Sequence, residues 1–166
     1  MSHKVYRAGI ITASDKGAAG QREDLSGETL KDILRENGYV VASCCVLPDD
    51  QELLAAELIR LADGDVCDVV FTTGGTGLSP RDVTPEATLS VAHRLVPGIS
   101  EAIRAQSMHI TNRAMLSRGV SVIRERTLII NLPGSPKAVR ESLAVILDAV
   151  SHGLAILRGD DGECAR

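Results

Sequence analysis

The sequence is poor in aromatic residues, with no tryptophan, one phenylalanine and two tyrosines among 166 residues. Proteins that bind single-stranded nucleic acid commonly stack its bases on aromatic side chains, so this composition disfavours such a role. Basic residues are not in excess either, because 18 Lys and Arg residues are set against 22 Asp and Glu residues, for a net charge of −4. A broad attraction to nucleic acid or to acidic membranes is therefore not expected, and any phosphate-binding site must be local.

The sequence also lacks the cysteine patterns that hold zinc or carry out redox chemistry. Its four cysteines form no CxxC pair, and no histidine lies beside them at the spacing of a metal ligand. We expect Cys44, Cys45 and Cys67 to be free thiols buried in the core.

Long apolar segments are missing as well. No stretch approaches the roughly 20 apolar residues that cross a membrane, and the first eight residues contain no apolar run like that of an export signal. From the sequence alone we expect a soluble protein of the cytoplasm.

The apolar residues that are present, mainly Ala, Val, Leu and Ile, are typical of helices packed on a buried sheet. A chain of this length buries about 70% of the surface that its unfolded state exposes, so one domain needs no disulfide or metal for stability. We expect a single domain over residues 1–158 and a flexible C-terminal tail over residues 159–166.

Hydrophobic periodicity and turn residues predict strands that alternate with helices. The expected strands are Val5–Thr12, Tyr39–Leu47, Val66–Thr73, Val120–Arg124 and Thr127–Leu132. Expected helices follow near Ser26, Asp50, Thr84 and Lys137, and the stretch Ile99–Leu116 is also expected to be helical. Ser26 and Thr84 are the expected caps of their helices, and Pro97-Gly98 is the expected end of the helix that Thr84 begins.

The connections between these elements indicate the fold class. The two-residue link Glu125-Arg126 between the last two strands predicts an antiparallel hairpin. Elsewhere, strands and helices alternate, which predicts right-handed crossovers between parallel strands. The sequence therefore predicts a three-layer α/β/α fold, with a mainly parallel sheet and an antiparallel edge hairpin.

Four loops that follow strands should meet at one edge of the sheet, because the carboxyl ends of parallel strands lie together. They contain Ser14, Asp15, Lys16, Asp49, Asp50, Gly74, Gly75, Thr76, Gly77, Ser79, Arg81, Asp82, Pro133, Gly134, Ser135 and Lys137. Glycines let backbone N–H groups approach an anion, hydroxyl groups donate hydrogen bonds, and Lys or Arg neutralises phosphate. Carboxylates beside a phosphate need a cation between them, commonly Mg²⁺. The loops therefore predict a site for a nucleotide and its metal.

Structural roles compete with this interpretation. The glycines of residues 74–77 could simply form tight turns between packed elements. Asp49 or Asp50 could cap the following helix, and Asp82 could pair with Arg81 or accept hydrogen bonds from backbone N–H groups of its own loop. Known glycine-loop motifs do not decide the matter, because the Leu-Ser-Pro that follows these glycines fits neither a P-loop nor a dinucleotide fingerprint.

Several stretches of the sequence resemble one known family. "TTGGTG" (residues 72–77), "RDVTPEAT" (81–88) and "NLPGSPKAV" (131–139) resemble the Mog/MoaB family of molybdenum-cofactor biosynthesis, also found as the G domain of gephyrin-like proteins. "GIITASDKG" near the start and "LPDD" at residues 47–50 are similar to further loops of the family, in the same order. The resemblance covers nearly the whole chain, and "NLPGSPKAV" is closer to the adenylyltransferase branch than to the MoaB branch.

The resemblance implies an enzyme that transfers AMP from ATP to the terminal phosphate of molybdopterin and releases pyrophosphate. It implies Asp49 and Asp82, which match the family's functional aspartates, as the catalytic residues that hold Mg²⁺. It also implies a set of residues that bind the substrates: Ser14, Asp15, Thr73, Gly74, Gly75, Thr76, Gly77, Arg81, Pro133, Gly134, Ser135 and Lys137. Within this set the glycine backbone is the expected phosphate cradle, and Arg81 and Lys137 are the expected phosphate-neutralising side chains.

The resemblance further implies the molybdopterin-binding domain fold, a homotrimer, and a product that is handed to a molybdenum insertase. The apolar face of the helix that begins near Lys137 is either core or partly subunit contact, and the sequence does not divide the two. An alternative within the family is a non-catalytic molybdopterin-binding or carrier protein of the MoaB type.

Overall fold

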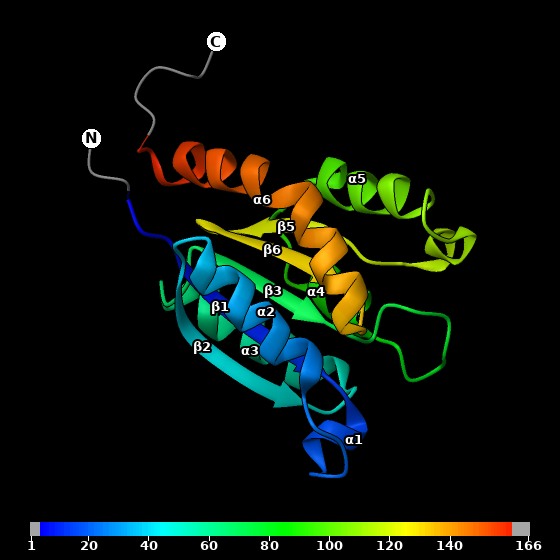
Figure 1. Cartoon of the computed structure of the whole chain (residues 1–166). Helices are drawn as coiled ribbons and strands as arrows, with labels where there is room; N and C mark the ends of the chain where they lie inside the picture. The colour runs from blue at the N-terminus through cyan, green and yellow to red at the C-terminus, as the bar shows by residue number, and fades with distance from the viewer. Residues whose placement is uncertain (1–3, 161–166) are drawn as a thin grey trace.

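The computed structural model describes residues 4–160, which form a six-stranded sheet covered by helices on both faces (Figure 1). The strands are β1 (Arg7–Ala13), β2 (Val40–Leu47), β3 (Val69–Thr73), β4 (Arg94–Leu95), β5 (Ser121–Arg124) and β6 (Thr127–Leu132). Their order across the sheet is β2-β1-β3-β6-β5-β4. The first four in this order are parallel, and β5 and β4 join antiparallel, which confirms the predicted sheet with its antiparallel edge.

Helices connect the strands and supply the two outer layers. They are α1 (Asp15–Ala18), α2 (Leu25–Glu36), α3 (Gln51–Asp63), α4 (Thr84–Ser90), α5 (Pro97–Ser107), the 3-10 helix η1 (Asn112–Leu116) and α6 (Pro136–Arg158). Figure 1 shows α2, α5 and α6 on one face of the sheet and α3 and α4 on the other. The predicted tail lies mostly in residues 161–166, outside the described residues.

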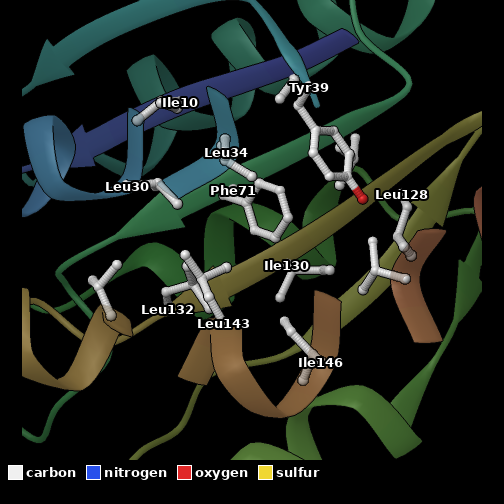
Figure 2. Close-up of a cluster of buried hydrophobic side chains, with 14 of the residues drawn as sticks. Ile10, Leu30, Leu34, Tyr39, Phe71, Leu128, Ile130, Leu132, Leu143 and Ile146 are labelled. Carbon is white, nitrogen blue, oxygen red and sulfur yellow. The ribbon is translucent and has the colours of Figure 1, made fainter. Parts of the chain in front are cut away.

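The core has two parts, one on each face of the sheet, because successive residues of a buried strand point to opposite faces. Phe71 of β3 is fully buried, and it packs with Leu34 of α2 and Leu143 of α6 on one face (Figure 2). On the other face Val70 and Ile129 belong to the cluster formed with α3 and α4. This double burial explains why the strands read as continuous apolar runs in the sequence.

Three predicted helix boundaries were wrong. Asp24, not Ser26, caps α2, and its carboxylate accepts a hydrogen bond from the Gly27 N–H at 3.0 Å. Thr84 is the first residue of α4 and makes no capping bond. Pro97 begins α5 instead of ending a helix, because a proline fits the first turn, where its missing N–H is not needed.

The segment between α4 and β5 also departs from the prediction. It contains the short strand β4, which the sequence did not reveal because two residues show no periodicity. The helix expected from Ile99 to Leu116 is divided into α5 and η1, and Thr111 caps η1 by accepting a hydrogen bond from the Arg113 N–H at 3.3 Å.

Of the thiols expected to be buried, only Cys67 is fully buried. Cys44 is exposed and Cys45 is half-buried, because β2 is an edge strand whose alternate side chains face outward. Burial raises the pKa of both Cys45 and Cys67 to about 11, so both thiols are protonated at neutral pH. Within residues 4–160, none of the helices has the length and apolarity needed to span a membrane.

Candidate active site

A cavity of about 570 Å³ opens at the carboxyl ends of β1, β2, β3 and β6, where the sequence predicts that the loops meet. Several of the predicted site residues line it: Ser14, Asp49, Thr73, Gly74, Gly75, Asp82, Gly134 and Ser135. They come from four separate loops, so the fold gathers distant parts of the chain into one site, as the parallel order of these strands requires.

The other predicted site residues lie around the cavity and not in its lining. These are Asp15, Thr76, Gly77, Arg81, Pro133 and Lys137. The Pro133 carbonyl accepts a hydrogen bond from the Thr73 hydroxyl at 2.7 Å, which links the ends of β3 and β6. Lys137 is the most exposed of them, with its Nζ 3.7 Å from Glu141 and 77% of its side chain accessible.

Asp15 and Asp49 hold the first two loops together by reciprocal hydrogen bonds. The Asp15 N–H donates to Asp49 Oδ2, and the Asp49 N–H donates to Asp15 Oδ1, each at 3.0 Å. Arg81 adds a two-pronged contact, because its Nε and Nη2 each donate to the Asp15 carboxylate at 2.9 Å. The hydrogen bonds from Arg81 lower the pKa of Asp15. The Asp15 carboxylate is therefore ionised, and the positive charge of Arg81 balances it.

Within the described residues, Asp49 has no arginine or lysine partner of this kind. Burial raises its pKa, and the nearby carboxylates of Asp15 and Asp82 raise it further. Its neighbour Asp50 caps α3 by accepting a hydrogen bond from the Leu53 N–H at 3.0 Å. The capping alternative left open by the sequence is thereby assigned to Asp50, and Asp49 faces the cavity without a capping role.

Asp82 also faces the cavity, and it does not pair with the adjacent Arg81. One of its oxygens accepts a hydrogen bond from the Ser79 N–H at 3.0 Å, so the loop-bracing alternative is correct for that oxygen. Among residues 4–160, no Lys or Arg side chain forms an ion pair with Asp49 or Asp82. Two carboxylates without a Lys or Arg ion-pair partner in these residues therefore share the cavity, whose lining also contains Arg22.

The glycines let the loops approach one another and the carboxylates closely. Gly74 and Gly75 have positive φ angles of 89° and 69°. A methyl group on Gly74 would lie 2.5 Å from the Ala13 carbonyl oxygen, and one on Gly75 would lie 3.2 Å from Asp49 Oδ1. Both positions require glycine, so the turn-forming alternative is correct for these two residues, and their role as a phosphate cradle stays a prediction.

Thr84 contributes an unusual polar atom behind this loop. Its Oγ1 is buried and has no hydrogen-bond partner within the described part of the chain. A methyl group on Gly75 would clash with this Oγ1, so Thr84 Oγ1 and Asp49 Oδ1 face the same small space beside Gly75. A buried hydroxyl group without a hydrogen-bond partner is uncommon and lowers stability, so this position is a candidate for a functional role.

Sequence reasoning missed the part of the cavity formed by the segment before α2. Arg22 and Asp24 of this segment line the cavity, and the hydroxyl of Thr12, near the end of β1, donates to Asp24 at 2.9 Å. Asp24, two residues before Ser26, could have been recognised as the helix cap beside the loops, because aspartate is a preferred N-cap residue. Arg22 carried no signal, because a single basic residue in a loop is normally a solvated surface group.

A second missed residue, Arg118, lies between η1 and β5 and braces the loop that carries Asp82. Its guanidinium donates to the Gly77 carbonyl at 2.8 Å and to the Asp82 carbonyl at 2.7 Å, and it pairs with Glu86. Its backbone N–H donates to the Thr76 carbonyl at 2.9 Å. The hydrogen bonds from Arg118 lower the pKa of Glu86, so this ion pair is formed at neutral pH.

Comparisons with known proteins agree with this geometry. Residues 9–152 match the family model described as "Probable molybdopterin binding domain". The molybdopterin adenylyltransferases of Helicobacter pylori J99 and Escherichia coli K12 are 38% and 40% identical to the chain. These matches cover 92% and 89% of this chain and 88% and 79% of the relatives.

Solved structures give the same result. The molybdopterin biosynthesis enzyme MoaB of Thermus thermophilus superposes with a TM-score of 0.88 at 43% identity, over 93% of this chain and 98% of that one. The matched region includes all four loops that form the cavity. The chain therefore belongs to the molybdopterin-binding domain family of molybdenum-cofactor biosynthesis.

Proposed function

We propose that the chain is a molybdopterin adenylyltransferase, which transfers AMP from ATP to the terminal phosphate of molybdopterin. The names of the relatives, at about 40% identity over most of the chain, support this activity. The observation that carries it furthest is the cavity, where two carboxylates without a Lys or Arg ion-pair partner in residues 4–160 stand beside glycine loops at the carboxyl edge of the sheet. A site with unmatched negative charge suits a substrate that arrives with its own cation.

In the proposed reaction an oxygen of the molybdopterin phosphate attacks the α-phosphorus of ATP. A new phosphorus–oxygen bond forms while the bond to the β-phosphate oxygen breaks, and pyrophosphate leaves with the electron pair. The attacking oxygen is already anionic, so the protein need not create a nucleophile. Its main tasks are to align two anions that repel each other and to stabilise the charge on the leaving group.

Ser14 and Ser135 are suited to hold the phosphates. Each hydroxyl oxygen accepts a capping hydrogen bond, from the Gly17 N–H at 3.0 Å and the Ala138 N–H at 3.2 Å respectively. A hydroxyl group that accepts one bond still has its hydrogen to donate, and both serines line the cavity. The Gly75 backbone, free of a Cβ atom, completes the proposed phosphate cradle, while the Gly74 N–H donates to the Leu132 carbonyl at 3.3 Å and holds the turn.

Asp49 and Asp82 are the residues that would hold Mg²⁺. Residues 4–160 contain no group of three or more His, Cys, Asp or Glu side chains placed to hold a metal. Two carboxylates fit Mg²⁺ nevertheless, because this ion is usually bound by one or two carboxylates with water and substrate phosphates. The raised pKa of Asp49 is consistent with a site that needs a cation. When bound, Mg²⁺ would neutralise the phosphates and the departing pyrophosphate.

A MoaB-type role, binding or carrying molybdopterin without AMP transfer, is the second candidate. It is favoured by the 43% identity to the Thermus MoaB structure. The two candidates differ in what Asp49 does. An adenylyltransferase needs this carboxylate for turnover, whereas a carrier should bind molybdopterin equally well with alanine at this position.

One experiment separates them. The purified protein is incubated with molybdopterin, ATP and Mg²⁺, and both adenylylated pterin and pyrophosphate are measured. Formation of both in equal amounts, and its loss when EDTA removes the metal, supports the adenylyltransferase. A folded protein that binds molybdopterin but forms neither product would overturn the first proposal in favour of the second.

The proposal includes a cytoplasmic homotrimer that passes its product to a molybdenum insertase. The apolar face of α6 is used mainly by the core, since Val139, Leu143 and Val150 are buried within one chain. Subunit contacts would therefore draw on other apolar side chains, and Leu95 and Met115 are at least 60% exposed. Light scattering of the purified protein measures the subunit number directly.

A further inference from the structure

We propose that Arg118 is a positioning residue for AMP transfer, which fixes the turn from Gly77 to Asp82 so that the Asp82 carboxylate faces the cavity. This inference rests on the function proposed above. Arg118 does not line the cavity, so it would act through Asp82 and not by contact with a substrate.

The loop that carries Asp82 has little regular structure of its own. Residues 74–83 belong to no helix or strand. Within the loop, the Asp82 N–H donates to the Ser79 carbonyl at 2.9 Å, and the Ser79 N–H donates back to the Asp82 carboxylate at 3.0 Å. These bonds shape a local turn, but they do not tie that turn to the rest of the protein.

Arg81, inside the turn, attaches it to Asp15, and Arg118 attaches both of its ends. Its guanidinium reaches the carbonyl of Gly77, where the turn begins, and the carbonyl of Asp82, where it ends. The ion pair with Glu86 then connects the same guanidinium to α4. A planar group with several fixed donors can hold two carbonyls and a carboxylate at once, whereas a lysine ammonium is a compact point charge without this fixed geometry.

The segment that carries Arg118 is itself attached to α5. Arg104 of α5 donates from Nη1 to the Gly119 carbonyl at 2.7 Å and to the Ser117 carbonyl at 3.5 Å. The residues on both sides of Arg118 are thus attached to α5, and the Arg118 N–H is bonded to Thr76. The chain of contacts runs from α5 through Arg118 to the Asp82 turn without passing through the cavity.

The test compares Arg118→Lys and Arg118→Gln with a matched control, Arg124→Lys, in the full-length protein. Arg124 also binds a carboxylate and a carbonyl, through two bonds of 2.8 Å to Asp63 and one of 3.0 Å to the Val91 carbonyl, but it does not line the cavity or contact the Asp82 turn. Measurements are kcat, the Mg²⁺ concentration for half-maximal rate, molybdopterin affinity, and hydrogen exchange of residues 76–83.

We expect both Arg118 variants to lose at least about 10-fold in kcat and to need more Mg²⁺, because small displacements of a catalytic group strongly slow a reaction that depends on alignment. Molybdopterin affinity should stay within about twofold, and exchange should quicken in residues 76–83. Arg124→Lys should show none of these changes.

The positioning role would be overturned if Arg118→Lys kept the kcat and the Mg²⁺ dependence of the wild type. It would also be overturned if Arg124→Lys, at an equal folded fraction, lost as much activity as the Arg118 variants. A wild-type protein that transfers no AMP would instead overturn the proposed function, and the role of Arg118 in AMP transfer with it. The exchange measurement still reports in that case whether Arg118 holds the turn.

Discussion

The two edges of the parallel strands carry similar charged residues in opposite arrangements. At the amino edge, Asp68 accepts hydrogen bonds from Arg7 and lies 3.1 Å from Arg158 Nε, and the Asp68 and Arg158 side chains are only 4% and 8% exposed. At the carboxyl edge, Arg81 is engaged by Asp15, and no basic side chain in residues 4–160 pairs with Asp49. Charge is matched at one edge and left unmatched at the other.

The pKa directions express this difference. Burial opposes ionisation of Asp68, but hydrogen bonds from Arg7 and the nearby charge of Arg158 outweigh it and lower the pKa. Burial also opposes ionisation of Asp49, and neighbouring carboxylates add to the effect, so its pKa is raised. The comparison teaches that the same residue types stabilise the fold at one edge and, at the other, leave Asp49 without a basic partner, as the proposed Mg²⁺ site requires.

The largest expected effect comes from removing charge at the carboxyl edge. We expect Asp82→Asn to lower the rate of AMP transfer at least about 100-fold, while molybdopterin affinity changes little, because charge stabilisation matters most in the transition state. Asp49→Asn should cause a loss of similar size. Asp50→Asn is the matched control, since asparagine caps a helix nearly as well as aspartate, and it should leave the rate unchanged. A comparable loss in the control would contradict this assignment.

At the amino edge the expected loss is one of stability. Asp68→Asn leaves Arg7 and Arg158 without their main partner, which should lower the free energy of unfolding by roughly 3 kcal/mol. Urea denaturation measures this change. The rate per folded molecule should equal that of the wild type, so a slowed reaction in this variant would mean that the edges are not independent.

Acid should change the contributions of Asp68 and Asp49 to stability in opposite directions. The lowered pKa of Asp68 gives stability that is complete above the ordinary carboxyl value of 3.8 and is lost as pH falls through the folded value, so Asp68→Asn should flatten the acid limb of stability. The raised pKa of Asp49 costs stability at neutral pH. Asp49→Asn should therefore be more stable than the wild type at neutral pH, with a gain that disappears as pH falls toward 3.8. Urea midpoints across this range test both, and a gain for Asp49→Asn that persists in acid would argue against charge as its cause.

The smallest expected effect concerns unpaired hydroxyl groups. Thr84→Val should raise the free energy of unfolding by up to about 1 kcal/mol, because the buried Oγ1 has no hydrogen-bond partner to lose within residues 4–160. Ser142 of α6 is an equally buried hydroxyl without a partner in the described residues, and Ser142→Ala is the control. Only Thr84→Val should slow AMP transfer, since only Thr84 lies beside Asp49 Oδ1. Thermal melts and rates, measured together, show whether stability and activity separate.

Much of the fold could be predicted because the physical signals were local. Residues such as Val70 and Phe71 lie on strands buried on both faces, and such strands give unbroken apolar runs. Pro97 was misread because a proline suits both the start of a helix and the position after its end. β4 was missed because its two residues show no periodicity.

The candidate site was predictable where residues follow strands and not where they act across the fold. Asp49 and Gly75 follow strands directly, so parallel topology alone brings them together. Arg118 contacts residues more than 30 positions away, and no spacing rule in the sequence reports such a contact. The sequence likewise could not show which of Asp49 and Asp50 caps α3, because an aspartate at either position could do so.

The 23-residue α6 joins both edges, since Ser135 at its start lines the cavity and Arg158 at its end lies beside Asp68. These two contacts fix both the length of α6 and the rotation of its far end about the helix axis. Removing one residue from its middle would shorten it by about 1.5 Å and turn its far end by about 100°. The chain thus tolerates exchange of residues on this helix far better than any change in their number.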